Sequence, residues 1–260
     1  MTRPFFLTLS LIFITAAITE ALPQVSPEAV DAHYRSAGNS TEGLLQSAAM
    51  IAKGLEQSGP SDALSWRLAR TYYSLGKRSQ REAGKHYFHL CIQNAERTIE
   101  LNGQSAWGYF FRAICRGKQG QMQGIFRSLS LIKPVRQDLT TAVKLDPSVD
   151  HGGPHRALGK MYLDMPGILG GDLNKSIDHL KLALQYGPRH EENHLFLAEA
   201  LYEDGDYIAA RETLTALLQL TEDSGDNPEI QIIRGQAQEL MVKTLAWIES
   251  QPQNAQRNKN

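Results

Sequence analysis

The sequence has almost no net charge, and after its first residues it has no long apolar run. Its 27 Lys and Arg residues nearly balance its 28 Asp and Glu residues, which gives a formal net charge of -1 at pH 7. This balance argues against strong attraction of the whole chain to nucleic acid, so we expect no nucleic-acid partner. No later segment approaches the roughly 18 unbroken apolar residues that a membrane span needs. We therefore expect the mature protein to be soluble.

Motifs for catalysis and cofactor binding are also missing. The sequence has no Gly-Lys-Ser/Thr phosphate loop, no Gly-x-Ser-x-Gly elbow and no set of cysteines spaced for a metal. Gly170-Gly171-Asp172 is too short to cradle a nucleotide. We expect it to be a turn in which Asp172 caps a helix that starts near Leu173. The sequence therefore predicts a protein without enzymatic activity and without a cofactor.

One stretch matches the zinc-protease signature H-E-x-x-H, at His190-Glu191-Glu192-Asn193-His194. That signature needs two histidines within one helix, beside a Glu that acts as general base. Here His190 follows Pro188 in an expected turn, and no third ligand follows at the usual spacing. We interpret the match as coincidental and predict no metal site. A zinc hydrolase that uses His190, Glu191 and His194 is kept as the last alternative.

The first 21 residues have the features of an export signal. Met1-Thr2-Arg3 is a short basic start, and Phe5 to Ala17 is a mostly apolar run of 13 residues. Thr19 and Ala21 offer small side chains at the positions that a signal peptidase reads. We predict a cleavable signal peptide over residues 1–21 and a periplasmic or secreted protein, with an uncleaved anchor as the alternative. No cysteine follows the segment, so lipid attachment is not expected.

Apolar residues recur at three- and four-residue spacing from Ser58 to about Leu220, and no segment alternates as a strand would. Four segments share a helical pattern around a small residue, with the small residues 44, 46 and 39 positions apart: Ala69, Ala113, Gly159 and Ala198. A small residue lets the two helices of a hairpin approach closely, while larger apolar residues fill the flanks. The sequence predicts an all-α solenoid of tetratricopeptide-like hairpins over residues 58–220.

The first repeats are longer than the roughly 34-residue tetratricopeptide unit. We expect the extra residues to lie between the helices of each pair, and Gly124 and Pro134 to give a long or kinked helix in the second pair. Within 22–57 we expect a loosely ordered leader from Leu22 to Asn39 and a helix over 41–57, with Ser40 or Thr41 as its cap. After the repeats we expect a closing helix within 221–250 that runs from Pro228 to about Ser250, and a disordered tail over 251–260.

The two cysteines, Cys91 and Cys115, fall in neighbouring helices of this pattern. We expect Cys91 to begin the second helix of the first repeat, and Cys115 to lie late in the first helix of the second. Since consecutive helices run antiparallel, these two positions should lie side by side. A disulfide is then geometrically allowed, and an oxidising compartment would permit it. The alternative is two small buried apolar side chains.

The charge is unevenly placed along the chain. Residues 62–145 carry 14 Lys/Arg against 5 Asp/Glu, a net of +9, and residues 146–230 carry 6 against 16, a net of -10. Such a chain can attract an acidic partner at one end or associate head to tail as a homo-oligomer. The simpler interpretation is that solvated helix faces happen to differ in charge.

In a helical solenoid of this kind the first helix of each pair lines the concave side. Counted from the small residue of each helix, the inward positions are Trp66, Arg70, Tyr73, Trp107, Phe110, Arg156, Lys160, Leu195, Glu199 and Tyr202. Aromatic rings supply apolar area and charges fix orientation, so we predict a binding face for an extended or amphipathic ligand. The alternative is that these rings pack against the long insertions.

The chain resembles the T-component family of tripartite ATP-independent periplasmic (TRAP) transporters over about residues 60–220. The residues that carry the resemblance are Leu145-Asp146-Pro147, His151-Gly152-Gly153-Pro154-His155-Arg156-Ala157-Leu158-Gly159-Lys160-Met161-Tyr162, Gly170-Gly171-Asp172 and Asn193-His194-Leu195-Phe196-Leu197-Ala198-Glu199-Ala200. Trp66-Arg67-Leu68-Ala69-Arg70 and the long first repeats are similar, more faintly, to the regulators of microtubule dynamics.

The transporter resemblance implies a non-catalytic periplasmic adaptor. Its partner would be a solute-binding protein, with a hydrophobic small molecule as a further ligand, and self-association is also implied. Many members of that family are lipoproteins, and this sequence departs from them there. The family supplies no residue-level ligand pattern. A general scaffold for protein interactions in the cell envelope is the second functional hypothesis.

Overall fold

The computed structural model describes residues 25–38, 40–222, 225 and 227–250. The predicted signal peptide over 1–21 and the predicted tail over 251–260 lie outside these residues. The described part contains eleven α-helices, one short 3₁₀ helix and no β-strand, so the predicted all-α class is confirmed. The elements are α1 Pro27–Ala37, α2 Thr41–Ser58, α3 Asp62–Arg78, α4 Arg81–Leu101, α5 Ala106–Gln123, α6 Ile125–Leu145, α7 Val149–Asp164, η1 Gly167–Leu169, α8 Leu173–Tyr186, α9 Glu191–Asp204, α10 Tyr207–Leu220 and α11 Pro228–Ser250.

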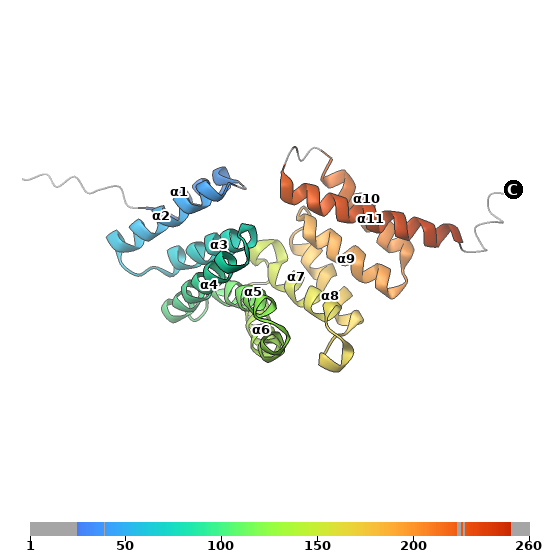
Figure 1. The fold of residues 1–260 in the computed structure, drawn as a ribbon, viewed down its shortest axis with the longest axis horizontal. Coiled ribbons are helices and arrows are strands. Elements are labelled where there is room, and N and C mark those ends of the chain that lie inside the picture. The colour runs from blue at the N-terminus through green and yellow to red at the C-terminus, as the bar shows by residue number, and fades with distance from the viewer. Residues whose placement is uncertain (1–24, 39, 223–224, 226, 251–260) are drawn as a thin grey trace, which may run out of the picture.

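The helices form five consecutive hairpins and one closing helix, which together bend into an arc (Figure 1). Each helix packs on the next one in the chain, and the odd-numbered helices also contact one another along the inner side of the arc. The even-numbered helices from α2 to α10 therefore form the outer layer. This is the two-layer arrangement of a helical-hairpin solenoid, in which each repeat buries its apolar face on its neighbours.

Helix α1 is the main departure from the expected flanks, because the predicted loose leader folds. Ser26 caps this helix by accepting a hydrogen bond from the backbone N–H of Ala29 at 3.2 Å, and Pro27 occupies its first turn. Val30 is only 1% exposed and packs with Ile51 of α2. The Ser-Pro start was the sequence signal for this helix, but a single buried apolar residue gave too little periodicity to reveal it.

Four helix ends fall where the sequence placed them. Ser40 caps α2 by accepting from the backbone N–H of Gly43, and Asp172 caps α8 by accepting from that of Lys175. The closing helix α11 has the predicted limits. These positions are predictable because a capping side chain satisfies backbone donors that a helix leaves free in its first turn.

The extra length of the first two repeats lies within their helices, so its predicted place between them is wrong. Helices α4 and α6 have 21 residues each, and short turns join them to α3 and α5. Gly124, with φ 103°, ends α5, while Pro134 is accommodated inside α6. Only the third pair has its extra residues between the helices, where η1 lies between α7 and α8. No proline or glycine cluster interrupts residues 85–101, so nothing stops that helix early.

The predicted small residues mark the closest approaches between helices. Ala69, Ala113 and Ala198 are each 0% exposed. At Gly159 a Cβ would lie 2.5 Å from Cγ of Leu180 on α8, so only glycine fits this contact. The backbone spacing of each hairpin is therefore fixed by one small side chain.

The structure joins Cys91 and Cys115 by a disulfide between α4 and α5, with their Cα atoms 6.3 Å apart. Both cysteines are 0% exposed. Cys91 lies in the middle of α4 and not at its start, because this helix begins ten residues earlier, at Arg81. The antiparallel juxtaposition that the repeats predicted is what brings the two sulfur atoms together.

Helix α7 begins with a tight backbone turn. Asp150 and His151 have φ of 50° and 57°, positive values that are unusual for non-glycine residues. Gly152 follows with φ 83°. A Cβ on Gly152 would lie 2.6 Å from the carbonyl oxygen of Ala183 on α8. The turn therefore requires glycine at this position for two independent reasons.

None of the described helices is both long enough and apolar enough to cross a membrane.

We predict that Gly152→Ala lowers the free energy of unfolding by more than about 1 kcal/mol, since it adds both a clash and an unfavourable φ. Gly235→Ala is the matched control, because Gly235 is exposed inside α11 with no atom near its added Cβ. This control should raise the free energy of unfolding by up to about 1 kcal/mol. Urea unfolding of both variants measures the difference, and equal effects would contradict the assignment of the turn.

The disulfide gives a second prediction. Protein purified from an oxidising compartment should show no free thiol in denaturant, and two after reduction. The variant with Cys91→Ala and Cys115→Ala should lose about 3 kcal/mol of unfolding free energy, as expected for a cross-link with a sequence separation of 24. Two free thiols before reduction would show that the cysteines are only buried apolar residues.

Candidate functional site on the concave face

The odd-numbered helices bring several of the predicted site residues into contact across the concave face. The rings of Trp66 on α3 and Trp107 on α5 stack, with centroids 4.2 Å apart and planes 9° from parallel. Lys160 on α7 donates to Glu199 on α9 over 2.9 Å. Lys160 and Glu199 each follow the small residue of their helix by one position, so residues at this level of α7 and α9 are neighbours in space.

Helix α1 covers the N-terminal end of this face. Asp31 of α1 accepts hydrogen bonds from Arg67 at 2.6 Å and from Arg70 at 2.7 Å. Burial alone would raise the pKa of Asp31, but the bonds from the two guanidinium groups hold it below its usual range. The Arg70 guanidinium also lies 3.9 Å from the ring centre of Tyr34. Arg70 and Trp66 are therefore occupied by the chain itself, which leaves little of this end for a partner.

Phe110 and Leu195 belong to the core, so their predicted place on an exposed binding face is corrected. Each is 2% exposed; Phe110 packs in the cluster around Phe111, and Leu195 packs with Leu214. Both lie three residues before the small residue of their helix, one turn away on the same side. This position faces the second helix of the hairpin. Trp66, at 9% exposed, occupies the same position in α3.

Arg156 is the fourth residue at that position, and it ties the third and fourth repeats together. It is 7% exposed, donates to Asp150 at 2.6 Å and to the side-chain oxygen of Asn193 at 3.1 Å, and pairs with Glu192 at 3.3 Å. Asn193 is 0% exposed. Its side-chain amide nitrogen lies 2.9 Å from each of three backbone carbonyl oxygens, those of His151, Ala183 and Gly187. Arg156 is thus held by partners within the chain.

The middle of the concave face carries two polar groups for which the described residues supply no hydrogen-bond or ionic partner, the Tyr73 hydroxyl and the Lys118 ammonium. Burial raises the pKa of Tyr73, and the negative charges of Glu192 and Asp150 raise it further. Water reaches the Lys118 side chain, and yet burial among the surrounding helices lowers its pKa. The positive charge of nearby Lys77 lowers that pKa further.

Lys118 was not among the residues predicted to face inward. Ile114, Lys160 and Glu199 each come directly after the small residue of their helix. Lys118 lies one helical turn after Ile114, on the same side of α5. Extending the inward positions by one more helical turn would have found it.

One rim of the concave face is closed by ion pairs between the two ends of the arc. Glu229, at the start of α11, lies 3.1 Å from Arg78 and 3.8 Å from Lys77, both at the end of α3. These pairs join the basic first half of the chain to its acidic second half. They are partly exposed, so they orient the two ends more than they stabilise them.

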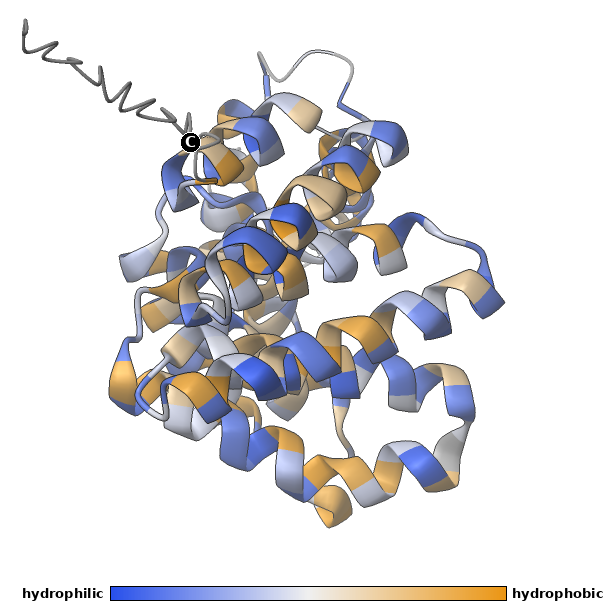
Figure 2. Cartoon of the chain, turned by 90° about the vertical axis from the view of Figure 1, so that its left-hand side faces the viewer, coloured by the Kyte–Doolittle hydropathy of each residue, from blue (hydrophilic) through white to orange (hydrophobic). Residues whose placement is uncertain are grey.

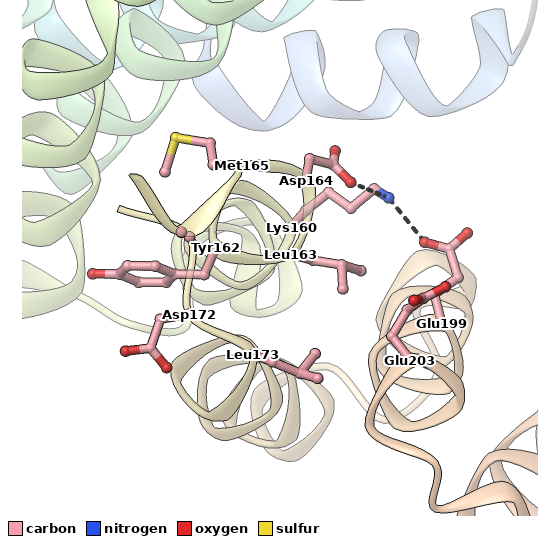
Figure 3. Close-up of a pocket in the computed structure, with 11 residues that line it drawn as sticks. Lys160, Tyr162, Leu163, Asp164, Met165, Asp172, Leu173, Glu199 and Glu203 are labelled. Atoms are coloured by element: carbon pink, nitrogen blue, oxygen red, sulfur yellow. Dashed lines mark hydrogen bonds and ion pairs between the residues drawn. The ribbon is translucent and has the colours of Figure 1, made fainter. Parts of the chain in front are cut away.

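A pocket of about 520 Å³ lies between α7, the turn around η1 and α9 (Figure 3). Lys160 points across it to Glu199 and also pairs with Asp164 at 2.8 Å. Burial would lower the pKa of Lys160, but hydrogen bonds to the two carboxylates raise it. Glu203 adds another carboxylate to the wall, while Tyr202 of the predicted set packs edge-on against Tyr207 with ring centroids 5.1 Å apart.

The H-E-x-x-H stretch does not form a metal site within the described residues. His190 precedes the first turn of α9, and Nε2 of His194 lies 2.9 Å from the carbonyl oxygen of Pro188. Burial lowers the pKa of His190 to about 3, and the positive charge of Arg156 adds to this effect. In the described part of the chain, no three His, Cys, Asp or Glu side chains gather as metal ligands would.

A second pair of histidines lies between α7 and α8. Nδ1 of His155 and Nδ1 of His179 are 2.8 Å apart, and Tyr186 stacks on His155 while Tyr162 stacks on His179. Burial lowers the pKa of His155 to about 4, and His179 lowers it further. At neutral pH both rings are uncharged and share one hydrogen bond.

These pKa values predict that acid destabilises the fold before its carboxylates protonate. An unfolded histidine has a pKa near 6.5, so between about pH 4 and 6.5 the unfolded chain binds protons that folded His155 and His190 do not. The free energy of unfolding should therefore fall from pH 7 to pH 5. His155→Phe keeps a ring against Tyr186 and should flatten this dependence, whereas variation of exposed His89 to Asn should not. Urea unfolding at both pH values decides; an unchanged slope in His155→Phe would contradict the assignment.

Comparisons with known proteins agree with this architecture. The family model of Regulator of microtubule dynamics protein 1-3 matches residues 28–151, and a tetratricopeptide-repeat model matches residues 168–237. The sequence resemblance at Trp66–Arg70 falls within the first of these. No curated protein matches the chain.

Among solved structures, the chain is similar to a thermophilic tetratricopeptide-repeat protein from Thermus thermophilus. The two share 15% sequence identity with a TM-score of 0.60, over 82% of this chain and 98% of the other. MamA from Desulfovibrio magneticus RS-1 shares 14% identity with a TM-score of 0.47, over 77% and 97% of the two chains. Identities this low inform on the fold alone. The described helices, the repeat model over residues 168–237 and the Thermus thermophilus structure together show a tetratricopeptide-like helical-hairpin fold.

Proposed function

We propose that this protein is a non-catalytic scaffold that binds a segment of a partner protein on its concave face, with an acidic side chain of the partner at Lys118. The observation that carries the proposal is the state of Lys118. It is a partly desolvated cation, open to water, with no carboxylate of the described residues bound to it.

The other two lysines of this region already have carboxylate partners within the chain, so Lys118 is the one that remains for an acidic partner. Lys160 pairs with Asp164 and Glu199, and Lys77 lies near Glu229. Lys118 has no such pair: Lys77 and Lys160 add positive charge near it, and Glu192 and Asp164 add negative charge, but no carboxylate of the described residues bonds to it. The helices around Lys118 lower its pKa and so disfavour its charged form, and a partner's carboxylate at this point would favour that form through a charge-assisted hydrogen bond.

Tyr73 adds a second contact beside Lys118. Its ring packs on Phe88 and Phe111, with centroids 6.2 Å and 6.3 Å apart, which fixes its direction. Its hydroxyl is left to donate to an acceptor such as a partner's backbone carbonyl. A rigid aromatic anchor beside a charge suits recognition of an extended or helical segment.

The compartment and the partner class rest on the sequence. The buried disulfide supports an exported, periplasmic protein, since such bonds persist in oxidising compartments. The transporter resemblance would make the partner a solute-binding protein, and a cell-envelope scaffold with another protein partner is the alternative. A hydrophobic small molecule is the less supported ligand, because four carboxylates line the pocket at Lys160: Asp164, Asp172, Glu199 and Glu203.

Peptide display on the purified protein tests the proposal without knowledge of the natural partner. Peptides selected from a random library should be enriched in Asp and Glu. Lys118→Gln should weaken the selected peptides by about tenfold, the cost of one charge-assisted hydrogen bond. Tyr73→Phe, which keeps the ring, should weaken them by a few-fold. Calorimetry or fluorescence anisotropy measures both effects.

Two conservative variants away from the concave face are the controls. Lys53→Gln on α2 removes an exposed lysine, and Tyr186→Phe removes an exposed hydroxyl on α8. Neither should change peptide affinity. A loss in these controls equal to the loss in Lys118→Gln, or selected peptides without acidic residues, would contradict the proposal.

A further inference from the structure

The outer side of the arc carries a helix face that the scaffold function does not use. On α6 the residues at successive turns of the exposed face are Phe126, Leu129, Lys133, Gln137, Thr140 and Lys144. Phe126 is 86% exposed and Leu129 36% exposed. An aromatic side chain exposed to this degree has no packing role in the fold, so its place on a protruding helix needs another explanation.

The charges around these side chains have one sign. Residues 101–137 contain six Lys and Arg and no Asp or Glu. The acid that follows, Asp138, is 6% exposed and is taken up by Arg112 and Arg116 of α5. Arg127, Lys133 and Lys144 have no carboxylate partner among the described residues. The exposed face of α6 is therefore cationic along its length and apolar at its N-terminal end.

The turn after α7 extends this surface. Ile168 in η1 is 94% exposed, and it has no apolar neighbour to cover it. The Arg136 guanidinium of α6 lies over the ring of Tyr162, 5.6 Å from its centre, and packs so closely on Gly170 that a Cβ there would lie 2.7 Å from one of its nitrogens. In Figure 1, α6 and the yellow turn before α8 both lie at the lower edge of the molecule. Figure 2 shows hydrophobic segments among hydrophilic ones at the same edge.

We propose that this edge, formed by Phe126, Leu129, Ile168 and the cations of α6, binds the surface of a membrane that contains anionic phospholipids. Phe126 and Ile168 would enter the interfacial region, while Arg127, Lys133 and Lys144 contact the headgroups.

The geometry favours a lipid surface over a protein partner. The two most exposed apolar side chains project singly from separate elements, and a cationic helix face lies between them. A protein interface has a continuous apolar centre with charges at its rim, and this edge has no such centre. A bilayer, in contrast, accepts isolated apolar side chains anywhere on its surface and attracts cations without a fixed geometry.

The position of this edge is compatible with the concave face. Helix α6 belongs to the outer layer, so a scaffold that lies on a membrane through α6 keeps α3, α5 and α7 open to a partner on its other side. The membrane contact does not depend on the proposed peptide binding and can be tested without it.

Sedimentation of the full chain with phospholipid vesicles tests the proposal. Binding should be strong with vesicles of phosphatidylcholine and phosphatidylglycerol, weak with phosphatidylcholine alone, and reduced by salt. Phe126→Ser with Ile168→Ser should lower the partition coefficient by about tenfold or more. Lys133→Gln with Lys144→Gln should lower it by roughly tenfold, as expected for two cations near an anionic surface.

Matched variants on other surfaces are the controls. Val242→Ser with Ile208→Ser removes two exposed apolar side chains, 67% and 49% exposed, from α11 and α10. Arg35→Gln with Lys53→Gln removes two exposed charges from α1 and α2. Both controls should bind anionic vesicles as the unmodified chain does, and circular dichroism should show that every variant is folded.

Three outcomes would overturn the proposal: no binding of the unmodified chain to anionic vesicles, equal loss in the α6 variants and their controls, or equal binding to duplex DNA, which would indicate a general attraction to polyanions.

Discussion

The close approach of two helices at a small residue is the constraint on which the rest of this structure depends. At Gly159 the hairpin leaves so little space that a Cβ would meet Leu180 at 2.5 Å. Alanines take the same role in three other hairpins. Because the small residue turns towards the second helix, the position three before it is buried as well, and the positions just after it face the concave side. The spacing along each odd-numbered helix thereby decides which side chains remain for a partner.

The uneven charge of the chain is partly used inside the molecule. Arg78 of the basic half meets Glu229 of the acidic half, so the arc brings together charges that are far apart in the sequence. The sequence allowed two explanations of this uneven charge, attraction of a partner or a chance difference between solvated helix faces. Neither is sufficient alone, since some of the charge is matched within the molecule and some is not. The unmatched part is what gives the molecule its two candidate surfaces, with Lys118 on the concave side and the exposed cations of α6 on the outer side.

Sequence patterns predicted the repeats, the capped ends of α2 and α8, the limits of α11 and the neighbouring cysteines, because each rests on local chemistry or on a regular period. They failed where tertiary contacts decide. Helix α1 forms because Val30 and Asp31 find partners on α2 and α3, and no local pattern reveals those partners. Phe110 and Leu195 looked like surface residues because the helical period does not say how wide the side of the helix is that packs on its hairpin partner. Lys118 was overlooked for a different reason, because it lies one helical turn beyond the inward positions that were considered.

A structure of the full chain with a peptide selected for affinity tests the proposed binding face most directly. We expect the peptide to lie along α3, α5 and α7, with a carboxylate oxygen about 2.7–2.9 Å from the Lys118 ammonium, the distance of a charge-assisted hydrogen bond. A peptide seated on the outer layer, or one on the concave face that leaves Lys118 without an anion, would contradict the proposal.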